Sequence, residues 1–213
     1  MAATESVLRS LRDATHDVHV RINHHPFIQG LTKPGFPIES YKRLLGAYFH
    51  LYEAIEREID VFALAHPTVL RYEPRRKLPW LRADLEFLNI DPRASPHCGT
   101  GPRALPPIPD VGAFIGMLYV IEGATLGGQV ISRHLHRHLG LSGVAGARFF
   151  NGYGDETKTQ QQWQDFRRLA GHTIGNETLL LSAQKSAVDV FKLFEEKLGV
   201  LHQTPDLSAM TTQ

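Results

Sequence analysis

The hydrophobic positions recur every three or four residues along almost the whole chain, which is the spacing of one face of an α-helix. Val7, Leu11 and Val18 establish this pattern near the start and predict a helix over residues 5–24, which Pro26 would end. No segment alternates hydrophobic and polar residues for long enough to predict a strand. The pattern therefore predicts an all-α fold. The further helices are expected over residues 39–65, 110–140, 155–171 and 175–201, with a shorter one after Pro79.

Turn-rich segments separate these helices at residues 30–40, 91–110 and 143–156. The segment over residues 91–110 is rich in Pro and Gly, but composition and period are the same on either side of it. It is therefore expected to be a surface connection and not a domain boundary. We expect one helical domain over residues 1–201 and a disordered tail over residues 202–213.

The composition excludes several classes of function. The 213 residues carry a formal net charge of +1, which gives no argument for nucleic acid or an anionic membrane as the main partner. Cys98 is the single cysteine, so an internal disulfide is impossible and a reducing, cytoplasmic setting is expected. The start of the chain lacks the apolar segment of a signal peptide, and no apolar run approaches the roughly 20 residues of a membrane span.

The first predicted helix carries a possible ligand-binding pair. Arg12 and His19 are seven residues apart, which places them on one face of the helix, about 10 Å apart along its axis. At that spacing the histidine could ligate a heme iron while the arginine reaches a propionate. A surface histidine beside a surface arginine gives the same pattern, so both interpretations stay open.

Three glycines interrupt the helix predicted over residues 110–140, each at a cost of about 1 kcal/mol relative to alanine. Tyr119, Gly123 and Gly127 step by four and share one face, and Gly128 follows directly. Such a stripe lets the backbone approach either another helix or a large flat ligand. If it meets a ligand, Tyr119 would offer a hydroxyl to the polar edge of that ligand.

Two other groups of side chains are weaker candidates for metal sites. His134 and His138 are four residues apart, but without a glutamate between them a solvated basic helix end is the expected interpretation. A helical di-metal oxidase would need several inward Glu and His residues on different helices, and His50, Glu53 and Glu56 make only a partial set.

Taken together, the order and spacing of the helical segments resemble the heme oxygenase family over residues 7–200. The first helix of that family resembles the segment LRDATHDVHVRINHHPF, residues 11–27. Its second and distal helices resemble YKRLLGAYFHLYEAIEREID (residues 41–60) and LYVIEGATLGGQVISRHL (residues 118–135). The segment FFNGYG (residues 149–154), followed by a helix that contains Trp, resembles the bacterial branch, particularly the enzymes associated with bacteriophytochromes.

This resemblance implies that b-type heme is both cofactor and substrate, that dioxygen is the co-substrate, and that biliverdin, ferrous iron and carbon monoxide are the products. It implies that His19, and not His16, is the iron ligand. Gly123 and Gly127 would be the catalytic residues, because they bring the helix backbone against the heme face and direct dioxygen toward a meso carbon. Gly128 would allow the helix to bend.

The resemblance also implies which residues hold the heme propionates, where the electrons come from and what the product serves. Arg12 and Tyr119 would hold the propionates, with Arg167 as a third candidate and Arg168 as the alternative to it. A ferredoxin or a reductase would supply the electrons. The biliverdin would serve a bacteriophytochrome, and the alternative purpose is heme degradation for iron acquisition.

Two positions depart from the animal-type members of the family. Ala124 stands where those enzymes have an aspartate that organises water for proton delivery, so protons would have to arrive through other ordered water. Asn23 stands where they have a glutamate that tunes the imidazole ligand. Ala124 leaves open a heme-binding or heme-sensing protein of the same fold without turnover. A helical scaffold without heme, in which the glycines pack helices and the histidines are incidental, is a separate alternative.

Overall fold

The computed structural model describes residues 2–69, 72–94 and 105–203 of the chain. These ranges fold into helices joined by short connections, and no β-strand forms within them, so the predicted all-α fold is confirmed. The elements in chain order are α1 (Ala2–His24), α2 (Pro26–Leu31), α3 (Ile38–Ala65), the 3-10 turn η1 (Glu73–Arg75), α4 (Leu78–Phe87), the 3-10 turn η2 (Pro92–Ala94), α5 (Val111–Leu139), α6 (Arg148–Asn151), α7 (Glu156–Thr173) and α8 (Glu177–Gln203).

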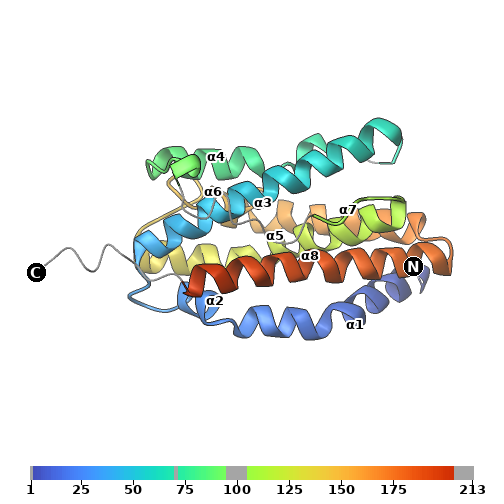
Figure 1. Ribbon diagram of the computed structural model, residues 1–213, viewed down its shortest axis with the longest axis horizontal. Coiled ribbons are helices and arrows are strands. Elements are labelled where there is room, and N and C mark those ends of the chain that lie inside the picture. The colour runs from blue at the N-terminus through green and yellow to red at the C-terminus, as the bar shows by residue number, and fades with distance from the viewer. Residues whose placement is uncertain (1, 70–71, 95–104, 204–213) are drawn as a thin grey trace, which may run out of the picture.

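The long helix α5 lies at the centre of the fold. It packs against α6, α7 and α8, while α1 packs against α7 and α8. Figure 1 shows α3 and α4 on one side of α8 and α1 on the other. The ends of α5 are well defined, because the side chain of Asp110 accepts a hydrogen bond from the backbone N–H of Ala113 (2.8 Å) and Gly140 ends the helix with φ of 69°. Both ends of the central helix are therefore capped.

Glycines hold α5 unusually close to α8. A Cβ added to Gly116 would lie 2.9 Å from the carbonyl carbon of Ala183 and closer still to its oxygen, and Gly112 meets the backbone of Leu179 in the same way. The obstacle in each case is backbone, which cannot rotate away as a side chain can. The stripe of small residues that packs helix against helix is thus Gly112 and Gly116, which lie two turns and one turn before Tyr119.

Replacing Gly116 with alanine is therefore expected to lower the free energy of unfolding by about 2 kcal/mol, because the added methyl group forces the two helix backbones apart. Gly199 of α8 is the matched control, since a Cβ there meets nothing within 4 Å. Urea denaturation of both variants measures the effect. A midpoint of Gly116→Ala as high as that of Gly199→Ala would show that the contact is not tight.

The structure corrects several predicted boundaries. Pro26 ends α1 but also begins α2, because proline suits the first turn of a helix, and the ring of His25 caps that turn by accepting the backbone N–H of Phe27. In the same way α4 begins at Leu78 with Pro79 in its first turn. The short helix α6 lies inside the segment expected to be only a turn-rich loop.

The end of the chain departs from the prediction by two residues. α8 continues to Gln203, so residues 202 and 203 are helical and do not belong to a tail. The rest of the predicted tail, residues 204–213, lies outside the described residues, as does Cys98.

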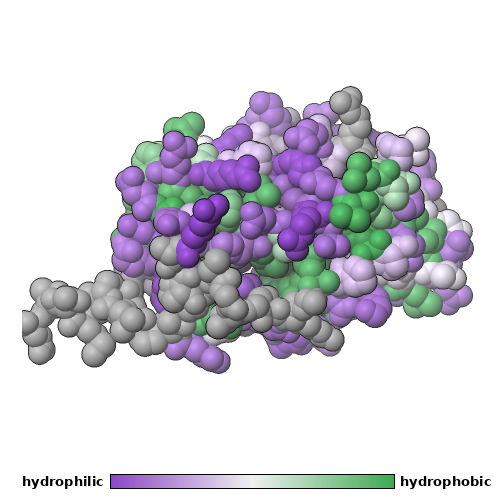
Figure 2. Space-filling view, turned by 45° about the horizontal axis from the view of Figure 1, so that its top comes forward, coloured by the Kyte–Doolittle hydropathy of each residue, from purple (hydrophilic) through white to green (hydrophobic). Residues whose placement is uncertain are grey.

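One described helix, α5, is long and apolar enough to cross a membrane by length and composition alone, which the sequence analysis did not anticipate. However, 67% of its most apolar window is buried inside the protein. Figure 2 shows that hydrophilic side chains cover most of the visible face, with smaller hydrophobic areas between them. The apolar character of α5 is therefore accounted for by its place in the core.

Candidate functional site

A cleft of about 740 Å³ lies between α1 and α5. It exists because these two helices both pack against α7 and α8 but hardly against each other. Most of its lining is hydrophobic, with polar side chains gathered on α1 and α2. The cleft has the size and the apolar character of small-molecule sites, which measure about 300–1,000 Å³.

His19 projects from α1 into this cleft. Partial burial and the nearby His16 lower the pKa of the His19 imidazole, so the ring is neutral at neutral pH. Its ring packs edge-on against Phe191 of α8, with the centroids 5.6 Å apart. A neutral imidazole held in this way has a free nitrogen lone pair, which is the form that binds a metal.

Asn23 orients the His19 ring from one turn further along α1. The amide nitrogen Nδ2 of Asn23 lies 3.4 Å from Nδ1 of His19. A histidine that binds a metal through Nε2 carries its proton on Nδ1 and needs an acceptor there, which the Asn23 amide supplies once it is turned by half a rotation so that its oxygen replaces Nδ2. The asparagine therefore keeps a hydrogen-bonding contact at the position where the animal-type enzymes have glutamate.

The opposite wall of the cleft is the glycine face of α5. A Cβ added to Gly123 or Gly127 would meet nothing within 4 Å, so both positions open onto free space in the cleft. Gly128 also lines the cleft, but its Cα faces α6, where a Cβ would lie 3.3 Å from the carbonyl oxygen of Phe150. The two alternatives for the glycine stripe thus apply to different residues: Gly123 and Gly127 leave room for a ligand, whereas Gly128 packs against a helix.

The residues around these glycines are apolar where they face the cleft. Ala124 lines it, but Glu122 and Thr125 do not. Glu122 is 2% exposed and turned into the protein, and the hydroxyl of Thr125 donates to the carbonyl oxygen of Ile121 (2.8 Å). No acid on α5 therefore reaches the cleft.

Arg12 and Tyr119 both line the cleft, although they lie on different helices, α1 and α5. Burial raises the pKa of the Tyr119 hydroxyl, while a hydrogen bond with Thr15 and the charge of Arg12 oppose that rise. Both residues also line an adjoining hollow of about 300 Å³, together with Trp163. A ligand in the cleft would thus meet one positive charge and one phenol at this side.

Arg167 belongs to that hollow and not to the cleft itself. Its guanidinium forms an ion pair with Glu5 (3.1 Å) across α1 and α7. Arg168 pairs with Asp165 on its own helix and lines neither space. Of the two arginines, Arg167 is therefore the one beside the cleft, and its guanidinium is already paired with Glu5.

Sequence reasoning missed the aromatic floor of the cleft. Tyr48 and Tyr52 of α3 meet Phe149 of α6, with ring centroids 5.7 and 5.1 Å from it, and Phe150 and Phe194 complete the floor. The hydroxyl of Tyr52 is buried and has no hydrogen-bond partner in the described part of the chain. The two tyrosines and Phe194 occupy core positions of predicted amphipathic helices, and Phe149 and Phe150 lie in a segment expected to be a loop, so none of them gave a signal of its own.

The other candidate groups have structural roles. His134 and His138 stack with centroids 5.9 Å apart, and the described residues contain no group of three or more potential ligands that could hold a metal ion. Of the partial di-metal set, His50 is hydrogen-bonded to the carbonyl oxygen of Pro92, and Glu56 accepts the backbone N–H groups of Lys77 and Leu78. These groups therefore do not converge on a common site.

Known proteins similar to this chain agree on one family. The family model described as Heme oxygenase matches residues 5–198. "Heme oxygenase" of Xanthomonas campestris pv. campestris (strain 8004) is 28% identical over 172 residues, which cover 81% of this chain and 96% of that protein. "Heme oxygenase 1" of Pongo abelii is 27% identical over 224 residues, which cover 96% and 76%.

Solved structures agree with this at the level of the fold. The heme oxygenase of Leptospira interrogans superposes with a TM-score of 0.74 at 19% identity, covering 93% of this chain and 100% of that one. Heme oxygenase-2 from Synechocystis sp. PCC 6803, solved in complex with heme and NO, gives a TM-score of 0.73 at 16% identity, covering 92% and 84%.

Proposed function

Because this chain belongs to the heme oxygenase family, an enzyme family of heme degradation, we propose that its cleft binds b-type heme and cleaves it with dioxygen to biliverdin, ferrous iron and carbon monoxide. One observation carries the placement of heme. The neutral imidazole of His19 faces a cleft whose α5 wall has two empty Cβ positions, at Gly123 and Gly127. Bound heme supplies both the iron that activates dioxygen and the carbon skeleton that is cleaved.

The residues of the cleft fit a heme in each of its parts. His19 would hold the iron, and the aromatic floor would supply the apolar surface for the porphyrin ring. Arg12 and Tyr119 lie where they can hold the propionates, and Arg167 can exchange its partner Glu5 for a propionate. On the α5 wall, Gly123 and Gly127 leave open space in the cleft, which a larger side chain at either position would fill.

Because no acidic side chain of α5 reaches the cleft, ordered water has to deliver the protons. Ala124 cannot hold a proton, and Glu122 is turned away from the cleft. Tyr52 lines the cleft, and its buried, unpartnered hydroxyl is a polar atom that can hold an ordered water by a hydrogen bond. Ordered water at Tyr52 is thus the route that this chain offers for protons.

The electrons come from a separate ferredoxin or reductase, as the resemblance to the heme oxygenase family implies. The product biliverdin serves a bacteriophytochrome. The support for this purpose is the resemblance of residues 149–154 and the following helix to the enzymes associated with such photoreceptors.

Replacing Gly127 with leucine tests the placement of heme. The larger side chain projects into the free space of the cleft, so we expect the affinity for ferric heme to fall about tenfold or more, while the fold is kept. Gly199→Leu is the matched control, because it makes the same change on a helix at an open position away from the cleft.

Two readouts separate the possible outcomes. Heme titration followed by the Soret absorbance measures affinity, and release of carbon monoxide with ascorbate, dioxygen and catalase present measures turnover. If Gly127→Leu binds and degrades heme as well as Gly199→Leu does, the heme does not lie against the glycine face. Binding by the wild type without any carbon monoxide would identify a heme-binding protein that lacks oxygenase turnover.

A further inference from the structure

One buried carboxylate, Asp84, lies outside the cleft and has no part in the chemistry described above. It is on α4, which contributes no residue to the cleft lining, and it is 1% exposed. Its two oxygens accept the backbone N–H groups of Arg148 (2.7 Å) and Phe149 (2.8 Å), which are the first two residues of α6. Asp84 thus caps a helix that is 64 residues away in the sequence.

The helix that Asp84 caps, α6, is too short to be stable in isolation. α6 is four residues long, and its own N-cap residue, Ala147, makes no side-chain hydrogen bond to it. A single turn is far below the length of about 12 residues at which isolated helices become marginally stable in water. The position of α6 therefore depends on contacts from outside, and the carboxylate of Asp84 supplies the polar ones at its start.

Two side chains of α6 form part of the cleft lining. Phe149 and Phe150 are both buried and both line the cleft floor. The backbone of Phe150 also packs against Gly128 of α5, so a shift of α6 would move both the aromatic floor and its contact with the glycine helix. We propose that Asp84 is a positioning residue for the heme cleft, which acts by fixing α6 and through it the rings of Phe149 and Phe150.

Burial also changes the acidity of Asp84. Burial raises the pKa of this carboxyl to about 6, although the two backbone hydrogen bonds and the nearby Arg148 lower it. Its other titratable neighbour, Tyr41, is buried, and its hydroxyl donates to the carbonyl oxygen of Gly146. Because the folded state holds this proton more tightly than the unfolded state, the contribution of Asp84 to stability falls as pH rises from about 4 to 6.

Substitution of Asp84 with asparagine tests the proposal, which rests on the proposed heme site. Asparagine has one acceptor oxygen and presents an amide N–H₂ to the other backbone N–H, so α6 loses one of its two anchors. The probe is iron-free protoporphyrin IX, which fills the cleft without needing His19. We expect Asp84→Asn to bind it about tenfold more weakly than the wild type at pH 7.5.

A matched variant separates positioning from general destabilisation. Asp110→Asn changes a capping carboxylate at the start of α5, which is also bonded to Ser182 and does not line the cleft. We expect this variant to lose stability but to bind the porphyrin like the wild type. Equal affinities of Asp84→Asn and the wild type, or equal losses in the two variants, would overturn the proposal.

Amide hydrogen exchange of the wild type decides the matter if Asp84→Asn does not fold. Strong protection of the Arg148 and Phe149 amides is expected, because both are donors to the buried Asp84 carboxylate. Unprotected amides would show that Asp84 does not hold α6. A wild type that binds no porphyrin yet protects these amides would contradict the proposed heme site and leave the cap intact, so the two failures are distinguishable.

Discussion

Replacing His19 with alanine is expected to lower the affinity for ferric heme on the order of a hundredfold, which corresponds to nearly 3 kcal/mol. The reason is the loss of the imidazole that faces the cleft in its neutral form. The visible spectrum of the remaining complex should lose the features of histidine-ligated iron. Added imidazole should restore them, because the substitution leaves a space of the right shape beside Phe191.

His16 provides the control for this variant. It also lines the cleft, one turn earlier on α1, so His16→Ala removes an imidazole from the same wall. We expect His16→Ala to keep the histidine-ligated spectrum, with the folding of both variants checked by circular dichroism. The opposite result, in which His16→Ala loses the ligand features and His19→Ala keeps them, would reverse the assignment of the iron ligand.

Replacing Glu122 with glutamine is expected to lower the free energy of unfolding by about 3–5 kcal/mol. The carboxylate of Glu122 lies in the core, 3.1 Å from both Arg75 and Lys77, and accepts the hydroxyl proton of Tyr153 at 3.0 Å. Without its negative charge the two cations remain buried and unneutralised. Since whole domains are stable by only about 5–15 kcal/mol, this is a large fraction of the total.

Lys77 supplies a second variant that tests the same account. It is fully buried, and burial lowers the pKa of its ammonium group. Adding Lys77→Met to Glu122→Gln should recover part of the lost stability, because it removes one unneutralised cation. Urea denaturation measures all three proteins.

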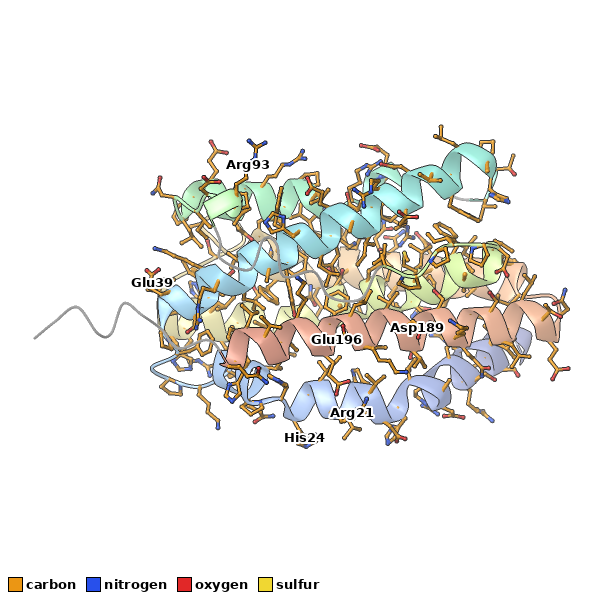
Figure 3. All side chains as sticks on the ribbon, viewed as in Figure 1. Arg21, His24, Glu39, Arg93, Asp189 and Glu196 are labelled. Carbon is orange, nitrogen blue, oxygen red and sulfur yellow. The ribbon has the colours of Figure 1, made fainter. Side chains whose placement is uncertain are left out.

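The control is an ion pair at the surface. Glu195 of α8 binds Arg21 of α1 at 2.6 Å, and Figure 3 shows Arg21 on the outer helix α1. Solvent screens this pair, so Glu195→Gln should cost about 1 kcal/mol or less. If Glu122→Gln is no less stable than Glu195→Gln, the buried cluster does not hold α5 in place.

The fold was predictable because apolar residues recur every three or four positions along the whole length of a long amphipathic helix. α3, α5, α7 and α8 each present a continuous apolar face, and all of them appear close to the expected positions. Helices of one or two turns carry too few positions to show a period. α6 therefore stayed hidden, because what stabilises it is a carboxylate on another helix.

The candidate site was predictable only where its residues share one helix. His19 with Arg12, and Gly123 with Gly127, could be placed together from spacing alone, and the structure brings both pairs to one cleft. Contacts between distant segments leave no such trace. The ion pair between Lys77 and Glu122, 45 residues apart, depends on how α5 packs and could not be read from either segment.

The central claim is that heme bound in this cleft is degraded there, and a single-turnover experiment tests it most directly. Protein loaded with one equivalent of heme is mixed with ascorbate or reduced ferredoxin in air, with catalase present to remove free peroxide, while the visible spectrum is followed. The account predicts that the Soret band decays as a broad red band of biliverdin grows, with carbon monoxide released. A Soret band that persists with every electron donor tested, in protein that has bound heme, would contradict it.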